Sequence, residues 1–337
     1  MSSVEATRFR SNPVFWLFLV AVLVGAWWLV HSLGKGRQAL MALLHIPLPD
    51  VLAIILLALL YFFIQGSVFN FIYRILKIHR PLNYGVLMFL ASNFVNTVAP
   101  VVGLSGFAYI VYIESKRGIS QPRAILLTIL FYLIDYGAFL FLLLIAISYL
   151  AITSSLPRPI LIGTIIFGGL IALLASVMVL FFTHPTLLRK VLGRIRKVGT
   201  VQAKEFGDQA TIAFQEVRHS HRLIFYAVAL AFINHFVAIL LLGVAFGAAG
   251  LTPTLPLLLA GYSIGTLLAI VSITPAGLGV AEGGMVAAFA GLGVSIESAV
   301  LVSLLYRFGI VIVPLLLGLP ALHRIQDQAS SSALLPL

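Results

Sequence analysis

The sequence predicts an all-α polytopic membrane protein with six full transmembrane helices and two re-entrant helical hairpins, arranged as inverted-topology repeats. The first reason is composition: 61% of the 337 residues are hydrophobic and 9% are charged, a balance that soluble domains do not have. The second is that apolar runs of about 20 residues or more, the length that crosses a bilayer, recur along the chain. The third is that two further apolar stretches are interrupted by proline and glycine.

Six apolar runs have the length and composition of transmembrane helices. Their residue ranges are 14–33, 51–75, 124–151, 160–182, 223–248 and 298–319. The first run is too long for the apolar core of a signal peptide, so we expect it to form the first span. Asp135 and Arg307 lie inside two of the later runs, and ionisable residues at bilayer depth indicate a functional site.

An apolar stretch at about 84–113 is predicted to form the first re-entrant hairpin. It contains no charged residue and is broken at Pro100, Gly103 and Gly106. One straight helix of this length would measure about 45 Å, which is too long for a single crossing. Basic residues flank both ends, which indicates that the chain enters and leaves on the same face of the membrane.

The second hairpin is predicted at about 251–296 and contains the stretch S-I-T-P-A-G-L-G-V-A-E-G-G at 272–284. Proline and glycine interrupt a helix because they remove a hydrogen bond or cost conformational entropy. At membrane depth such broken backbone is tolerated only where it is buried in protein or lines a cavity. Glu282 lies inside the break and is therefore a candidate functional group.

The positive charges predict the topology. Of the 21 Lys and Arg residues, 17 fall on one side of this arrangement, and cytoplasmic loops of membrane proteins carry such an excess. Both termini are therefore predicted to be cytoplasmic, in a multi-pass protein of the cell membrane. The net charge of +11 is explained by this pattern, and nucleic acid is not an expected partner.

Two segments are predicted to lie outside the spans. Residues 184–222 form a basic connector in which apolar and cationic residues alternate at helical spacing. We expect an amphipathic helix on an anionic leaflet there, with a plain solvated linker as the alternative. Residues 323–337 are polar and end the chain, and they are predicted to be a disordered tail.

An internal repeat relates the two halves, 1–154 and 155–337. A shift of 175 residues places Pro100 on Pro275, and without a gap it also places Gly118 on Gly293 and Ser120 on Ser295. The charge pattern independently makes the first hairpin open inward and the second outward. Transporters built from inverted repeats hold their substrate near the middle of the membrane, at discontinuous helices.

The stretch at 272–284, followed by L-L-Y-R at 304–307, resembles the lysylphosphatidylglycerol synthase transmembrane-region family. A weaker similarity covers 93–120. This family includes the flippase half of bacterial aminoacyl-phosphatidylglycerol synthase/flippases and many standalone membrane proteins. The resemblance implies a flippase whose partner is a phospholipid with an anionic or aminoacylated head group. The fused aminoacyl-transferase domain is absent from the 337 residues, so we do not expect this chain to synthesise aminoacyl lipid.

Glu282 and Arg307 are predicted to form one functional unit, because they and Asp135 are the ionisable residues other than histidine that we place deep in the apolar segments. The start of a half-helix and the guanidinium of Arg307 can both bind a phosphate, and Glu282 can receive an amine. Asp135 can add a further polar group to the surface that the head group would contact. Further candidate contacts in and before the hairpin tips are Asn93, Asn96, Pro100, Gly103, Ser105, Gly106, Pro275, Gly277, Gly279 and Gly283.

Two other functions compete with lipid transport. One is a non-transporting membrane partner of a separate lipid-modifying or glycosyl-transferring enzyme. The other is an intramembrane enzyme, since residues 103–106 read G-L-S-G, which matches the G-x-S-G of rhomboid proteases, and His235 would be its base. A four-residue match is weak, and His235 is expected to be a packed interior histidine. The sequence thus predicts no catalysis, cofactor or metal, and leaves a homo-oligomer open.

Overall fold

The computed structural model describes residues 46–98, 104–153, 200–272 and 274–332, together with the single positions 169, 172, 173 and 176. These parts of the chain are helical and contain no strand, so the all-α class is confirmed. The helices are α4 (Leu48–Ile75), α5 (Leu82–Val98), α6 (Leu104–Lys116), α7 (Gln121–Thr153), α10 (Thr200–Arg218), α11 (His221–Ala248), α12 (Leu255–Val271), α13 (Val280–Gly291), α14 (Ile296–Arg307) and α15 (Val313–Ser332).

Four of the described helices are long and apolar enough to cross a membrane. They are α4, α7, α11 and a continuous helix built from α14, the π-helical turn η2 (Phe308–Ile312) and α15. These match four of the six predicted spans. The other two predicted spans, 14–33 and 160–182, lie outside the described residues, as do residues 187–198 of the connector.

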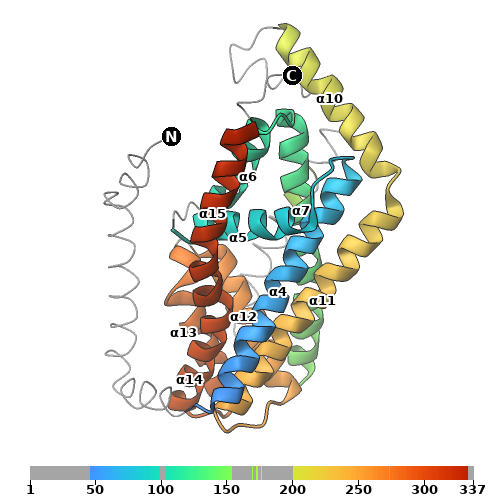
Figure 1. Cartoon of the computed structure of the whole chain (residues 1–337). Helices are drawn as coiled ribbons and strands as arrows, with labels where there is room; N and C mark the ends of the chain where they lie inside the picture. The colour runs from blue at the N-terminus through green and yellow to red at the C-terminus, as the bar shows by residue number, and fades with distance from the viewer. Residues whose placement is uncertain are drawn as a thin grey trace.

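The centre of the bundle is the contact between α4 and α11, which lie side by side in Figure 1. Ala227, Ala231, Ala238 and Ala245 fall on one face of α11 and are buried. Small side chains let two membrane helices approach closely, and such packing is what holds helices together in lipid. The buried face is marked by the helical spacing of these alanines, and hydropathy averaged over the segment does not show which face of the helix is buried.

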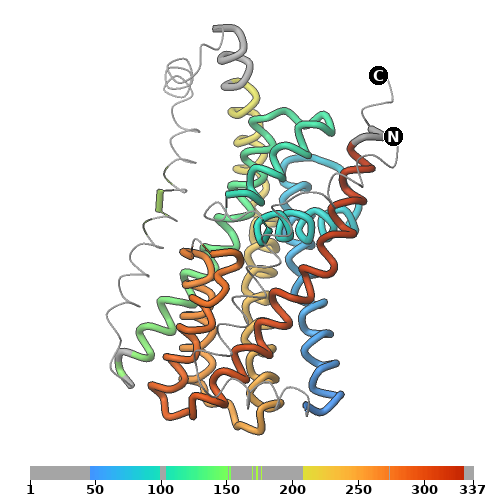
Figure 2. Tube along the Cα trace, turned by 90° about the vertical axis from the view of Figure 1, so that its left-hand side faces the viewer, coloured from blue at the N-terminus to red at the C-terminus, as the bar shows by residue number. Residues whose placement is uncertain are grey.

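The first hairpin region consists of α5 and α6. Figures 1 and 2 show that α5 lies across the long axis of the bundle instead of along it. It packs between α4 and α15, and at Gly318 of α15 a Cβ atom would lie 2.5 Å from the Cβ of Phe94. Close backbone packing on both sides therefore fixes the transverse position of α5. The predicted hairpin tip, with Pro100 and Gly103, lies outside the described residues.

Two helices joined by a break lie within the range 251–296 of the second predicted hairpin, and the re-entrant course of this hairpin remains a prediction. The helix α12 ends at Val271, the short 3-10 turn η1 (Pro275–Gly277) follows, and α13 begins at Val280. The two arms pack against each other, with Met285 and Phe289 of α13 fully buried. In Figure 2 this hairpin runs along the bundle axis, unlike α5. The relation of the two halves as inverted repeats remains a prediction.

The prediction of a disordered tail from residue 323 is wrong for residues 323–332, because α15 continues to Ser332. Leu322, Ile325 and Ala329 are buried at helical spacing, and α15 packs on α5 and α6. Arg117, directly after α6, also donates a 3.1 Å hydrogen bond to Gln328. These contacts stabilise a polar helix end that composition alone predicts to be disordered. Residues 333–337 lie outside the described part.

The described part of the connector is a packed helix and not a solvated linker. In α10, Ala210, Ala213 and Val217 are buried as the helix packs on α7. An ion pair of 2.7 Å joins Arg123 of α7 to Glu216 of α10. Whether the connector lies on an anionic leaflet remains a prediction.

Candidate functional site

The chain between α12 and α13 adopts a backbone that most residues avoid. Gly277 and Gly279 have φ of +70° and +82°, and Ala276 has φ of 51°, in the left-handed region that favours glycine. At Gly277 a Cβ atom would also lie 2.6 Å from the Cα of Ala269. Two of the predicted site glycines are therefore needed for the shape of the break itself.

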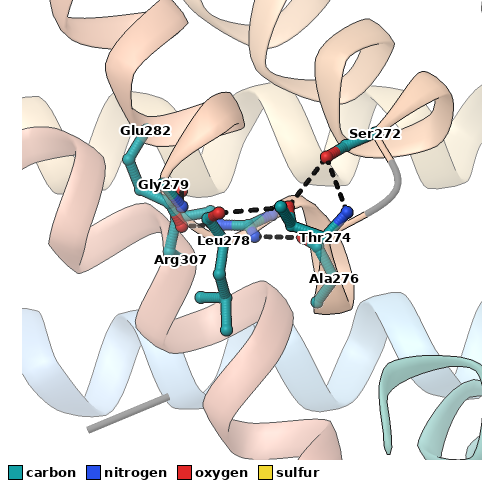
Figure 3. Close-up of polar contacts among 7 residues, drawn as sticks. All are labelled: Ser272, Thr274, Ala276, Leu278, Gly279, Glu282 and Arg307. Carbon is teal, nitrogen blue, oxygen red and sulfur yellow. Dashed lines mark hydrogen bonds and ion pairs between the residues drawn. The ribbon is translucent and has the colours of Figure 1, made fainter. Parts of the chain in front are cut away.

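Two hydroxyl side chains hold the turn before η1. The Ser272 and Thr274 hydroxyls are 2.7 Å apart, and the Thr274 hydroxyl donates a 3.1 Å bond to the Leu278 carbonyl (Figure 3). Both residues line the cavity described below. Neither residue was predicted from the sequence, although serine and threonine commonly satisfy free backbone groups in turns.

Glu282 connects the break to the last membrane helix. One of its oxygens accepts a 2.7 Å hydrogen bond from the Gly279 amide, and the other accepts a 2.6 Å bond from Nε of Arg307. Arg307 also donates to the carbonyl of Ala276, as Figure 3 shows. Both side chains are buried, at 4% and 7% exposure. The ion pair that the sequence suggested is thus present and holds both ends of the break.

The start of α13 already carries an anionic group in this structure. Glu282 is the third residue of α13, and its bond to the Gly279 amide satisfies an N–H group at the helix start. An acidic side chain in the first turn also interacts favourably with the helix dipole. The start of α13 is therefore occupied by the Glu282 carboxylate, and a phosphate would have to displace it to bind there.

A cavity of about 220 Å³ lies beside the break, between α4, α5, α7, α11, α12 and α14. Four predicted site residues line it together, although they come from three helices: Asn93, Asn96, Asp135 and Arg307. Further polar residues in its wall are Gln65, His235, Tyr262 and Thr266. Arg307 is the one Arg or Lys side chain among the described lining residues.

Among the described residues, the other predicted site residues do not line this cavity, and Pro100 and Gly103 lie outside the described part of the chain. Gly283 is exposed, and a Cβ atom there would meet nothing within 4 Å. Gly106 serves close packing instead, because a Cβ atom would lie 2.8 Å from the Ser92 carbonyl oxygen. Ser105 and Pro275 are half-buried and outside the cavity wall.

Asp135 lies in the cavity wall with polar neighbours from three other helices. Gln65 of α4 donates a 2.8 Å hydrogen bond to Oδ1 of Asp135. His235 of α11 places Nε2 at 3.0 Å from the Asp135 carbonyl oxygen and Nδ1 at 2.5 Å from the Tyr262 hydroxyl of α12. The prediction of a packed interior histidine is confirmed, since His235 is 3% exposed and uses both ring nitrogens.

A third buried acidic residue, besides Glu282 and Asp135, was not predicted from the sequence. Glu114, at the end of α6, is fully buried and accepts hydrogen bonds from Tyr73 at 2.7 Å, Tyr84 at 2.6 Å and Arg80 at 3.1 Å. Its position next to Lys116 and Arg117 made it resemble a solvated hairpin flank. The cluster joins α4, α5 and α6 outside the cavity, so we assign it a packing role.

Most of the chain is similar to known membrane proteins. Residues 15–318 match the family described as the lysylphosphatidylglycerol synthase TM region. The chain is also similar to the UPF0104 membrane protein MJ1595 of Methanocaldococcus jannaschii, with 25% identity over 279 residues, covering 80% of this chain and 82% of the archaeal protein. The broken stretch, the Glu282–Arg307 pair and the cavity beside them all fall inside the matched range. The chain therefore belongs to the lysylphosphatidylglycerol synthase transmembrane-region family.

Proposed function

We propose that this protein moves phospholipids with an anionic or aminoacylated head group between the two leaflets of the cell membrane. The observation that carries the proposal is the position of Arg307. Its guanidinium lines the cavity and at the same time binds Glu282 and the broken backbone at Ala276. A ligand that binds this guanidinium would act directly on the contact that holds the break together.

The chemistry of the pair suits a phosphate head group. A guanidinium binds two phosphate oxygens with two parallel hydrogen bonds, and in a buried site such bonds are stronger than in water. A head-group phosphate on Arg307 would replace Glu282 as its anionic partner. An amine on the same head group would then bind the carboxylate of Glu282, which the phosphate has released from Arg307. Zwitterionic and aminoacylated lipids therefore fit the same pair.

Reconstitution of the purified chain tests the proposal. Vesicles of phosphatidylglycerol and phosphatidylethanolamine containing a fluorescent phosphatidylglycerol would be treated with a membrane-impermeant reductant that bleaches only the outer leaflet. We expect labelled lipid to change leaflet in vesicles that contain the protein and not in protein-free vesicles. A protein that only recruits a lipid-modifying or glycosyl-transferring enzyme would leave the two vesicle preparations equal, and that result would overturn the proposal.

The topology predicted from the positive charges can be tested by cysteine labelling, because the chain contains no cysteine. A cysteine at Gln202 in α10 should react with an impermeant maleimide only after the cells are opened. A cysteine at Thr252, between α11 and α12, should react in intact cells. Labelling of the first position from outside would show that the charge-based orientation is reversed.

Ser105 is not expected to act as a nucleophile. The imidazole of His235 is engaged with Tyr262 and the Asp135 carbonyl, and Gly106 is explained by close packing. We therefore expect Ser105→Ala to translocate lipid at nearly the wild-type rate. Gly106→Leu, which places a side chain against α5, should lower the yield of folded protein. Labelling of Ser105 by a fluorophosphonate probe would contradict this expectation.

A further inference from the structure

Three acidic side chains are buried among the described residues, and one of them differs from the other two. Glu282 is bound to Arg307 at 2.6 Å, and Glu114 is bound to Arg80 at 3.1 Å. No Lys or Arg of the described part of the chain is paired with Asp135; its oxygen accepts a bond from the neutral amide of Gln65. This difference between Asp135 and the two glutamates needs a physical explanation, because burying a charge without a partner costs free energy.

His235 does not have to supply the missing charge. A carbonyl oxygen only accepts hydrogen bonds, so Nε2 of His235 donates to the Asp135 carbonyl at 3.0 Å. A neutral ring with its proton on Nε2 can accept the Tyr262 hydroxyl proton on Nδ1, at 2.5 Å, and both nitrogens are then satisfied. The distance of 3.7 Å from Nε2 to Oδ1 of Asp135 is too long for a hydrogen bond.

The other groups around Asp135 are also uncharged or already paired. From its own helix and the helices packed against it, the groups facing the same cavity are Tyr61, Tyr132, Tyr136, Tyr262, Tyr306 and Arg307. Arg307 is bound to Glu282. Two further described helices pack on α7: Glu114 of α6 is bound to Arg80, and Glu216 of α10 is bound to Arg123.

We propose that Asp135 is a proton-binding site that couples lipid movement to proton movement. This inference rests on the proposed transport function. An ionised carboxylate at bilayer depth is costly, and a bound proton removes its charge while leaving an oxygen to accept from Gln65. Asp135 and His235 both lie in the cavity wall, so a proton and a lipid head group would reach the same space.

The charge of the loaded cavity gives the direction of coupling. A head-group phosphate on Arg307 adds a negative charge near Asp135, which lines the cavity, and near Glu282, which is bound to Arg307. With Asp135 ionised, these four groups would carry two net negative charges, and with Asp135 protonated they carry one. The anionic head group therefore favours protonation of Asp135, and by reciprocity the proton favours the anionic head group. Lipid and proton are thus expected to move in the same direction.

A chemical test of the proton site needs neither a variant nor transport. Dicyclohexylcarbodiimide adds to protonated carboxyl groups in apolar surroundings, and mass spectrometry locates the adduct. In the purified chain we expect an adduct at Asp135 that decreases as the pH is raised. Glu282 and Glu114 should remain unmodified because they are paired with arginine. An unmodified Asp135, or a larger yield at Glu282, would overturn the assignment.

The coupling is tested in the reconstituted vesicles with labelled phosphatidylglycerol. An inward gradient of one pH unit should raise the inner-to-outer ratio of labelled lipid by up to about tenfold for one coupled proton. Asp135→Asn should abolish this response, whereas Asp50→Asn, the same change at the start of α4 outside the cavity, should keep it. Wild-type protein modified by the carbodiimide should lose the response to the pH gradient, as Asp135→Asn does. This second measurement tests the coupling even if the Asp135→Asn variant does not fold.

The outcomes separate the two proposals. A wild-type protein that moves lipid equally with and without a pH gradient, or that responds to a sodium gradient instead, would overturn proton coupling and leave lipid transport standing. A wild-type protein that moves no lipid under any condition would overturn the transport function. The carbodiimide adduct would then still decide whether Asp135 carries a proton.

Discussion

Replacement of Arg307 by lysine is expected to reduce the rate of lipid translocation about ten- to hundredfold, although the positive charge is kept. The guanidinium now uses Nε for Glu282 and a terminal nitrogen for the Ala276 carbonyl. A lysine ammonium is a compact charge that cannot reproduce this planar, two-sided geometry on a phosphate. Hydrogen bonds to charged groups contribute about 1.5–3 kcal/mol each, and one such bond lost in the rate-limiting state gives the stated range.

The matched control for this variant is Arg324→Lys. Arg324 lies on α15, further along the same continuous helix, and is exposed. We expect it to translocate labelled phosphatidylglycerol at the wild-type rate in the vesicle assay. If Arg307→Lys also retained the wild-type rate, the guanidinium would have no special part in binding the head group.

The largest expected effect on stability comes from removing one member of the Glu282–Arg307 pair. Arg307→Met keeps most of the side-chain volume but leaves the Glu282 carboxylate buried at 4% exposure without its cation. Breaking a buried pair in this way costs about 3–5 kcal/mol. In the double variant Glu282→Gln, Arg307→Met no charge remains, and the oxygen of the introduced side-chain amide can still accept from the backbone amide of Gly279. The double variant should therefore melt closer to the wild-type temperature than Arg307→Met does.

Thermal melts in detergent, compared over the four proteins of the double-mutant cycle, check this expectation. The control cycle uses Arg123→Met and Glu216→Gln, which remove a pair whose arginine is 31% exposed. Partly exposed pairs contribute about 0–1 kcal/mol, so losses in the control cycle should be small. Additive losses at Glu282 and Arg307 would show that the two side chains do not act as a pair.

The sequence alone located the membrane-spanning helices of the described part of the chain and the break before α13. Hydropathy located the four described spans, because the bilayer requires about 20 apolar residues in each. Pro275, Gly277 and Gly279 located the break, since few other residues adopt its backbone conformations. Glu282 and Arg307 were predicted as partners because an isolated charge in an apolar segment is costly, and the structure contains their ion pair.

The tertiary structure decided which groups meet. The transverse position of α5 depends on close packing between α4 and α15, and the helical end of α15 depends on its contacts with α5 and α6. Glu114 was overlooked because its partners Tyr73, Tyr84 and Arg80 lie 30 to 41 residues away in the chain. Asp135 was recognised, but its neutral environment was not, since Gln65, His235 and Tyr262 come from three other helices. Local patterns fix the conformation of each segment, whereas the pairing of buried polar groups depends on how segments far apart in the sequence pack together.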